Sequence, residues 1–162
     1  MKGTKAVFLF LAFLLPICIF LFLKFFGKNE FAVPPLFTEE LPEILPGCQP
    51  VTLPYHIPDS TLASLTFAND SLVLIKFGKP DKEAATQLKR IDEEVGQGLQ
   101  YKTMEETEAG FTTQKKCTFL LKEPFDLVLV DRKGTIRGQY VANDREEVDR
   151  LLTEAAIILK KY

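Results

Sequence analysis

The sequence predicts an α/β fold in which a central mixed sheet carries helices on both faces, behind an apolar N-terminal segment. Two short apolar runs, Leu72–Phe77 and Phe125–Val130, have the length and composition of strands buried on both faces. Amphipathic stretches that begin near Asp81 and near Asp144 have apolar residues at helical spacing. The apolar segment is Ala6–Leu23, a run of 18 residues without a charge.

The first 28 residues predict a membrane anchor. Lysines flank the uncharged run on both sides, and two phenylalanines after Lys24 extend it to the roughly 20 apolar residues that a hydrocarbon core requires. A cleaved signal peptide is the alternative, but its apolar region runs about 7–15 residues before a small-residue cleavage site, and none is visible. We therefore expect an uncleaved transmembrane helix, with the rest of the chain on the periplasmic or extracytoplasmic side.

Residues 29–50 predict a proline-rich tether to a domain formed by residues 51–162. Proline removes a backbone donor and favours extended geometry in its predecessor, so this region cannot form a helix and reads as a semi-rigid spacer. At the start of the domain, Val51–Ile57 could add an edge strand, where proline is tolerated. Seven of the ten prolines lie in this part of the chain: Pro34, Pro35, Pro42, Pro46, Pro50, Pro54 and Pro58.

The first half of the domain predicts a strand, a helix and a second strand. Leu72–Phe77 is stopped by the Gly-Lys-Pro that follows it, and Asp81 then begins a helix that ends at Gly96. The apolar positions of this helix share one side, namely Ala84, Leu88, Ile91 and Val95. A shorter strand follows at Leu99–Met104, and a short helix is expected within the connector, residues 105–121.

The second half predicts a hairpin and a final helix. Gly134 can adopt the positive φ of a tight turn between Phe125–Val130 and Thr135–Val141. Asp144 as N-cap and Glu147 three residues later predict a capping box. Apolar residues follow at spacings of three and four: Val148, Leu151, Leu152, Ala155, Ile158 and Leu159. The resulting order, with a βαβ crossover before the hairpin, is thioredoxin-like.

The stretches LPYHIPD at Leu53–Asp59 and LVDRKGTIRGQY at Leu129–Tyr140 resemble parts of one family, Sco/SenC, the thioredoxin-fold copper and thiol factors of cytochrome oxidase assembly. The sequence LPYHIPD at Leu53–Asp59 is similar to the family's entry into the domain. The sequence LVDRKGTIRGQY at Leu129–Tyr140 is similar to its last hairpin, and Asp144–Leu152 continues into its last helix. The resemblance implies an anchored, exported domain that acts in assembly of a respiratory oxidase or another envelope protein. Thioredoxin-like folds also place a cis proline before the strand that matches Phe125–Val130, so Pro124 is either this cis proline or an ordinary proline at the start of a strand.

The site residues of that family are missing from this chain. Sco-like proteins carry a C-x-x-x-C motif after the first central strand and a histidine before the strand that matches Phe125–Val130, and these residues bind copper. Thiolates and an imidazole hold Cu(I), whereas the residues present here cannot replace them. We therefore expect a degenerate active site that keeps the scaffold, has no catalytic residue and serves as a partner surface. The candidate residues of this surface are Gly78, Lys79, Pro80, Asp81, Glu123 and Pro124.

Cys48 and Cys117 leave three possibilities open. An exported location permits a structural disulfide between them, which would pin the tether to the domain. Two free thiols are the second possibility, and a redox-active pair, working across space in place of the lost motif, is the third. His56 is the only histidine, and with both cysteines it could complete a Cys2His metal set. Cys18, inside the apolar run, is interpreted as a small apolar residue.

Charge and motifs exclude several functions. Lys2, Lys5 and Lys24 precede all 22 acidic residues, so the remaining 17 of the 20 basic residues give the rest of the chain a net charge of −5. Such a domain offers no basic field for phosphates, which argues against nucleic-acid binding. No phosphate-binding glycine loop and no Ser, His and Asp set is visible. We expect no cofactor, no metal and no small-molecule substrate, and a protein as the partner.

Overall fold

The computed structural model describes residues 2–26, 32–43, 46–65, 67 and 72–160, and the chain divides into two units, Met1–Phe31 and Ala32–Tyr162. The first unit contains α1 (Lys2–Phe26), a helix of 25 residues with Pro16 inside it. Its side chains are described at residues 10, 12–22 and 24. Large apolar side chains are exposed there: Phe10, Phe13, Leu14, Leu15, Ile17, Ile19, Phe20, Leu21 and Phe22.

The membrane-spanning prediction rests on this first unit. No helix within the described residues is long and apolar enough to cross a membrane, so the structure does not support the predicted transmembrane helix. α1 is nevertheless helical over almost all of the predicted anchor, including the run Ala6–Leu23.

The second unit is built on a four-stranded mixed sheet with the strand order β2-β1-β3-β4. β1 and β2 are parallel, β3 is antiparallel to β1, and β4 is antiparallel to β3. The α/β prediction with a mixed sheet is therefore confirmed. The strands are β1 (Leu72–Phe77), β2 (Leu99–Met104), β3 (Leu127–Asp131) and β4 (Ile136–Tyr140), so the first two have the predicted bounds and the last two differ by one or two residues.

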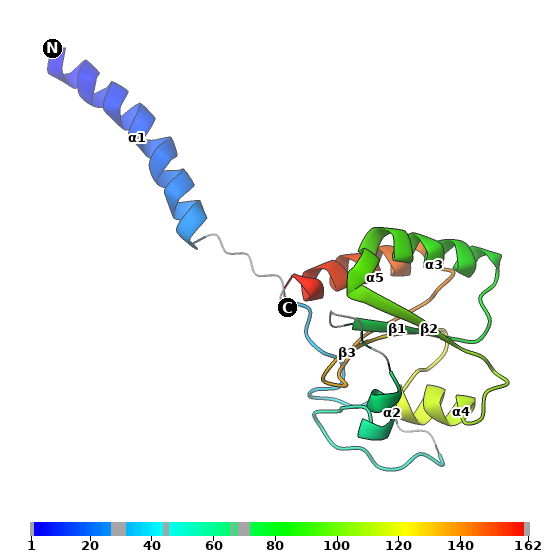
Figure 1. Cartoon of the computed structure of the whole chain (residues 1–162). Helices are drawn as coiled ribbons and strands as arrows, with labels where there is room; N and C mark the ends of the chain where they lie inside the picture. The colour runs from blue at the N-terminus through cyan, green and yellow to red at the C-terminus, as the bar shows by residue number, and fades with distance from the viewer. Residues whose placement is uncertain (1, 27–31, 44–45, 66, 68–71, 161–162) are drawn as a thin grey trace. The chain divides into compact units, whose positions relative to one another are not determined.

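Helices lie on both faces of this sheet (Figure 1). α3 (Lys82–Val95) and α5 (Arg145–Leu159) pack side by side on one face, and α3 continues into the short 3-10 turn η1 (Gly96–Gly98). On the other face lie α2 (Asp59–Ser64), α4 (Phe111–Thr113) and the π-helical segment η2 (Gln114–Thr118). The short helix expected in the connector is thus present, as α4 and η2.

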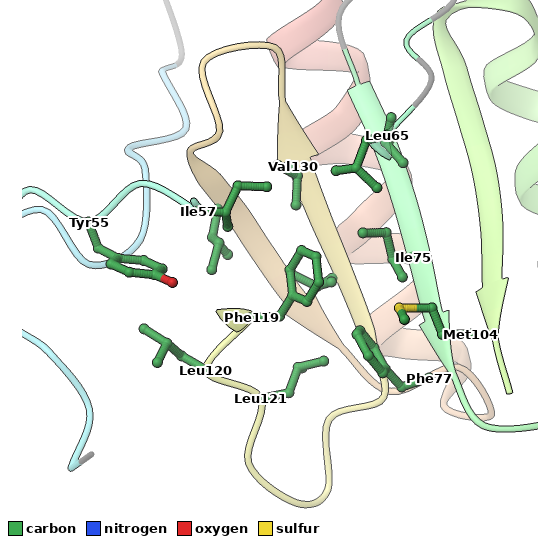
Figure 2. Close-up of a cluster of buried hydrophobic side chains, with 13 residues drawn as sticks. Tyr55, Ile57, Leu65, Ile75, Phe77, Met104, Phe119, Leu120, Leu121 and Val130 are labelled. Carbon is green, nitrogen blue, oxygen red and sulfur yellow. The ribbon is translucent and has the colours of Figure 1, made fainter. Parts of the chain in front are cut away.

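Each face of the sheet carries its own apolar cluster, which explains why β1 reads as a continuous apolar run. Leu72 and Leu74 pack under α3 and α5, while Val73, Ile75 and Phe77 face the opposite cluster. Figure 2 shows this second cluster, where Phe77 meets Phe119 with ring centroids 5.5 Å apart.

The region predicted as a tether packs in part on this domain. The Leu36 amide donates to the Ile136 carbonyl at 2.8 Å, and the Arg137 guanidinium donates to the Val33 carbonyl at 2.7 Å. Leu36, Phe37 and Leu41 are partly buried against the second cluster. The segment that begins at Ala32 thereby lies along β4.

One local prediction is wrong, and another is confirmed only in part. Val51–Ile57 forms no strand, because Pro54 cannot donate and the segment makes only isolated backbone bonds, from the Tyr55 amide to the Phe37 carbonyl and from the Ile57 amide to the Gly134 carbonyl. The capping box is only half formed. Asp144 accepts from the amides of Glu146 and Glu147, but the Glu147 carboxylate binds Arg150 instead of returning to the cap.

Candidate functional site

The candidate partner residues meet at one end of the sheet. β1 runs antiparallel to β3, and the Phe77 amide donates to the Asp126 carbonyl at 2.8 Å, so the residues after β1 and before β3 share that end. We call Gly78, Lys79, Pro80, Asp81, Glu123 and Pro124 the sheet-end surface. Lys79, Asp81, Glu123 and Pro124 are exposed, Pro80 is half-buried and Gly78 is buried.

The backbone fixes the first part of the sheet-end surface. Gly78 has a backbone φ of +82°, which residues other than glycine rarely adopt. Its amide donates to the Met104 carbonyl at 2.9 Å. Asp81 caps α3 as predicted, since its carboxylate accepts from the Ala84 amide at 2.7 Å. The short turn between strand and helix is therefore held at both ends.

The second part of the sheet-end surface is the dipeptide Glu123–Pro124. Its peptide bond is cis, as expected for the first of the two alternatives for Pro124. Glu123 pairs with Lys115 of η2 at 2.8 Å, and that hydrogen bond lowers the pKa of the Glu123 carboxyl below its ordinary value.

A buried ion pair beneath the sheet-end surface was not predicted from the sequence. The Lys76 ammonium lies 3.0 Å from a carboxylate oxygen of Asp126, and the side chains are 4% and 26% exposed. Lys76 also donates to the carbonyls of Phe77 and Gly78, at 2.8 and 3.3 Å. The other Asp126 oxygen accepts from the Ala142 amide at 2.8 Å. The lone lysine in the apolar run LVLIKF was the available signal, because a buried lysine needs a partner.

The chemistry of the sheet-end surface is limited by its residue types. Two carboxylates, one lysine and two prolines supply no thiolate and no imidazole, so thiol exchange or Cu(I) binding has no ligand there. Within the described residues no group of three or more His, Cys, Asp and Glu side chains is arranged to hold a metal ion. What this surface offers is a fixed backbone with exposed charges.

The second site is the cysteine pair. Cys48 and Cys117 form a disulfide, with their Cα atoms 5.2 Å apart. The bond confirms the predicted pairing and excludes the possibility that both cysteines are free thiols. Both residues are half-buried. The bond joins the proline-rich segment to η2, on the sheet face that α3 and α5 do not cover.

A pocket of about 640 Å³ lies beside this disulfide. Residues 47–58 form one wall, and the stretch from Thr113 to Thr118 forms the other, with both cysteines and His56 in the lining. The Tyr55 hydroxyl donates to the Thr118 carbonyl at 2.7 Å and ties the two walls together. Burial raises the pKa of Tyr55, so this donor keeps its proton at neutral pH. No local signal in the sequence predicts this pocket.

The Cys2His alternative does not fit this geometry. A Cys2His site needs both cysteines as thiolates, and the two sulfurs are already joined to each other. His56 directs Nδ1 to the Lys133 carbonyl at 3.1 Å. In this state the three residues do not form a ligand set.

Neither a protein-family model nor a curated protein matches this chain. The functional interpretation of the two sites is therefore argued from their geometry alone. Sco-like descent remains a hypothesis that is carried by the residues at Leu53–Asp59 and Leu129–Tyr140.

Proposed function

We propose that this chain is a membrane-anchored, exported thioredoxin-like module of Sco-like descent, which binds a protein partner through the sheet-end surface and performs no thiol chemistry there. The single observation that carries the proposal is a thiol-free turn, between β1 and α3, at the same end of the sheet as Pro124. On the strength of the resemblance, we propose that the partner is a protein under assembly, either of a cytochrome oxidase or elsewhere in the envelope.

The topology supports the thioredoxin-like part of the proposal. A parallel β1-α3-β2 unit, an intervening helical segment on the opposite face, an antiparallel hairpin and a last helix beside α3 reproduce the order expected of that fold. The turn after β1, where that fold carries its thiols, reads Gly-Lys-Pro-Asp in this chain.

The rigidity of the sheet-end surface supports a binding role. Lys76 holds two carbonyls of the turn from below, and Asp126, its ion-pair partner, is itself bonded to the Ala142 amide. A surface held in one conformation loses little entropy when a partner binds. Its exposed charges, Lys79, Asp81 and Glu123, would orient the partner.

The anchor and the export have separate support. The uncharged run Ala6–Leu23 is helical throughout, and its described large side chains are exposed and apolar. The Cys48–Cys117 disulfide is typical of an oxidising compartment, such as a periplasm. Fractionation of the full chain, with alkaline extraction of the membrane, tests the anchor, and release of the chain by alkali would contradict it.

Site-directed photocrosslinking in the native membrane tests the partner surface. A photoreactive residue at Lys79 should capture a partner, and Pro124→Ala should reduce the yield about tenfold if it removes about 1.4 kcal/mol of binding. The same residue at Lys89, which is 78% exposed on α3, is the matched control. Equal yields from both positions would contradict the proposal, and so would sub-micromolar Cu(I) binding by the purified chain.

A second function is favoured by the half-burial of the disulfide beside a pocket. The pair Cys48–Cys117 would exchange with a dithiol partner, as a thiol-disulfide protein does. In a Cys18→Ser background, which leaves only this pair, the chain should oxidise a dithiol in a single turnover. Replacement of either cysteine by Ser should then abolish the oxidation, whereas a wild-type pair that resists dithiols would exclude this function.

A further inference from the structure

We propose that His56 is the acid–base residue of thiol exchange at Cys48–Cys117, and that the adjoining pocket receives a cysteine-bearing segment of a dithiol protein or peptide. This inference rests on the second function proposed above. Its observation is a juxtaposition: one pocket is lined by both cysteines of the disulfide and by the only histidine of the chain.

The pocket is large enough for such a segment. About 640 Å³ lies within the range of sites that bind small ligands or a few side chains. Two walls that are distant in the sequence enclose it, residues 47–58 and the helical stretch up to Thr118. Because Cys48 and Cys117 are half-buried and not fully covered, an entering thiolate can reach the disulfide.

The hydrogen bonding of His56 sets its tautomer. Nδ1 lies 3.1 Å from the Lys133 carbonyl, which can only accept, so Nδ1 carries the proton. The Thr135 hydroxyl, 3.4 Å away, can accept from the same nitrogen. In the neutral ring Nε2 is then the basic nitrogen. No described residue forms a hydrogen bond with Nε2, and His56 is exposed.

The segment that carries Cys117 has an unusual backbone. Cys117 lies in a π-helical turn, and Leu120, three residues later, is buried with a φ of +51°. π-turns and positive-φ residues other than glycine are rare in proteins as a whole, but those that occur are often found at functional sites. Gly47, just before Cys48, also has a positive φ, of +93°. Cys117 therefore lies near backbone that its tertiary context must hold, whereas the glycine beside Cys48 adopts its positive φ without strain.

The proposed exchange balances without a further reagent. A partner thiol gives its proton to Nε2 of His56, and its thiolate attacks one sulfur of the disulfide. A bond forms between partner and protein, the Cys48–Cys117 bond breaks, and the released thiolate takes the proton from the imidazolium. The second thiol of the partner then attacks the mixed disulfide. The partner leaves with its two sulfurs oxidised to a disulfide, and Cys48 and Cys117 remain as two thiols.

Single-turnover kinetics of the full chain, in detergent and with Cys18→Ser, test the role of His56. The probes are a short synthetic peptide with two cysteines and dithiothreitol. We expect His56→Gln to lower the rate constant with the peptide by about 100-fold, the lower end of the range for general acid–base catalysis. Free imidazole should restore part of that rate. Lys89→Glu, on the exposed side of α3, should change it by less than about twofold.

An equilibrium measurement separates a base from a structural residue. A base accelerates exchange in both directions equally, so His56→Gln should leave the oxidised fraction in a fixed redox buffer and the melting temperature unchanged. A rate within about twofold of the parent, or a loss of rate that follows a shifted equilibrium, would overturn the inference. If the parent chain itself does not exchange, the second function fails. If the parent exchanges and His56→Gln exchanges equally, only the role of His56 fails.

Discussion

The sheet-end surface and the disulfide pocket divide between them the features that a thiol enzyme would combine. The sheet-end surface has the rigid turn, the helix cap and the proline, but no reactive group. The pocket has two sulfurs and an imidazole, but it lies on residues 47–58 and on η2, away from the strand–helix turn. Scaffold and reactivity are thus located on different parts of one domain.

The two regions are stabilised in different ways. The sheet-end surface is held by backbone geometry and by the Lys76–Asp126 ion pair of the sheet, and one exposed ion pair, Glu123–Lys115, joins it to η2. The pocket is held by a covalent bond and by the Tyr55–Thr118 hydrogen bond, which join a proline-rich segment to a short helix. Perturbing one region should therefore leave the other intact, and that independence can be tested.

Removal of the disulfide should have the largest effect. The bond closes a loop with a sequence separation of 69 residues, for which the loop-entropy model gives about 4 kcal/mol. Cys48→Ser with Cys117→Ser should lower the free energy of urea unfolding by about this amount. In the absence of urea, photocrosslinking from Lys79 should persist in this double variant if the two regions are independent. Loss of the crosslink in a variant that remains folded would contradict that independence.

Loss of the buried ion pair should come second. Lys76→Met leaves the Asp126 carboxylate, 26% exposed, without its cation, and breaking such a pair costs about 3 kcal/mol. The double variant Lys76→Met, Asp126→Asn removes the remaining charge and should recover most of that loss. Chemical denaturation checks both values. A single variant that loses less than about 1 kcal/mol would show that the pair does not support the turn.

Substitution of Gly78 should be smaller in stability and specific in binding. Gly78→Ala has room, since the added Cβ would meet only Glu106 at 3.6 Å, but the φ of +82° costs about 1 kcal/mol. Gly96→Ala is a matched control, because Gly96 has a φ of +64° and nothing within 4 Å of an added Cβ. Both variants should lose similar stability, and only Gly78→Ala should weaken the crosslink from Lys79. Equal crosslinking in both variants would show that the turn at Gly78 does not contribute to partner binding.

Local signals predicted much of the fold. The apolar run Leu72–Phe77 has the bounds of β1, and Asp81 caps α3 where the sequence placed it, because strand burial and helix capping are decided within a few residues. The position of the sheet-end residues followed from strand order. The pairing of Cys48 with Cys117 could be ranked first, since two cysteines in an exported domain have few alternatives.

Long-range contacts account for what the sequence did not predict. Lys76 lies in β1 and Asp126 just before β3, and nothing in the sequence LVLIKF indicates which residue pairs with its lysine. Val51–Ile57 alternates well enough for a strand, but no neighbouring edge accepts it as one, and Tyr55 bonds instead to Phe37. The pocket forms between residues 47–58 and η2, so the sequence of either segment taken by itself cannot predict it. Such features depend on tertiary packing and not on local propensity.

Acid titration of Glu123 should give the smallest effect and tests the link between the two regions. The Lys115 hydrogen bond lowers the pKa of Glu123, so the pair stabilises the fold above the carboxyl's unfolded pKa, and this contribution is lost as pH falls through the folded pKa. Glu123 is 82% exposed, so solvent screening limits the contribution to well under about 1 kcal/mol. Lys115→Gln should raise the Glu123 pKa toward its ordinary value, measured by carboxyl NMR. Because Lys115 belongs to η2, beside Cys117, reduction of the disulfide should leave this pKa unchanged if η2 stays in place, and a rise would show that the pocket and the sheet-end surface are coupled.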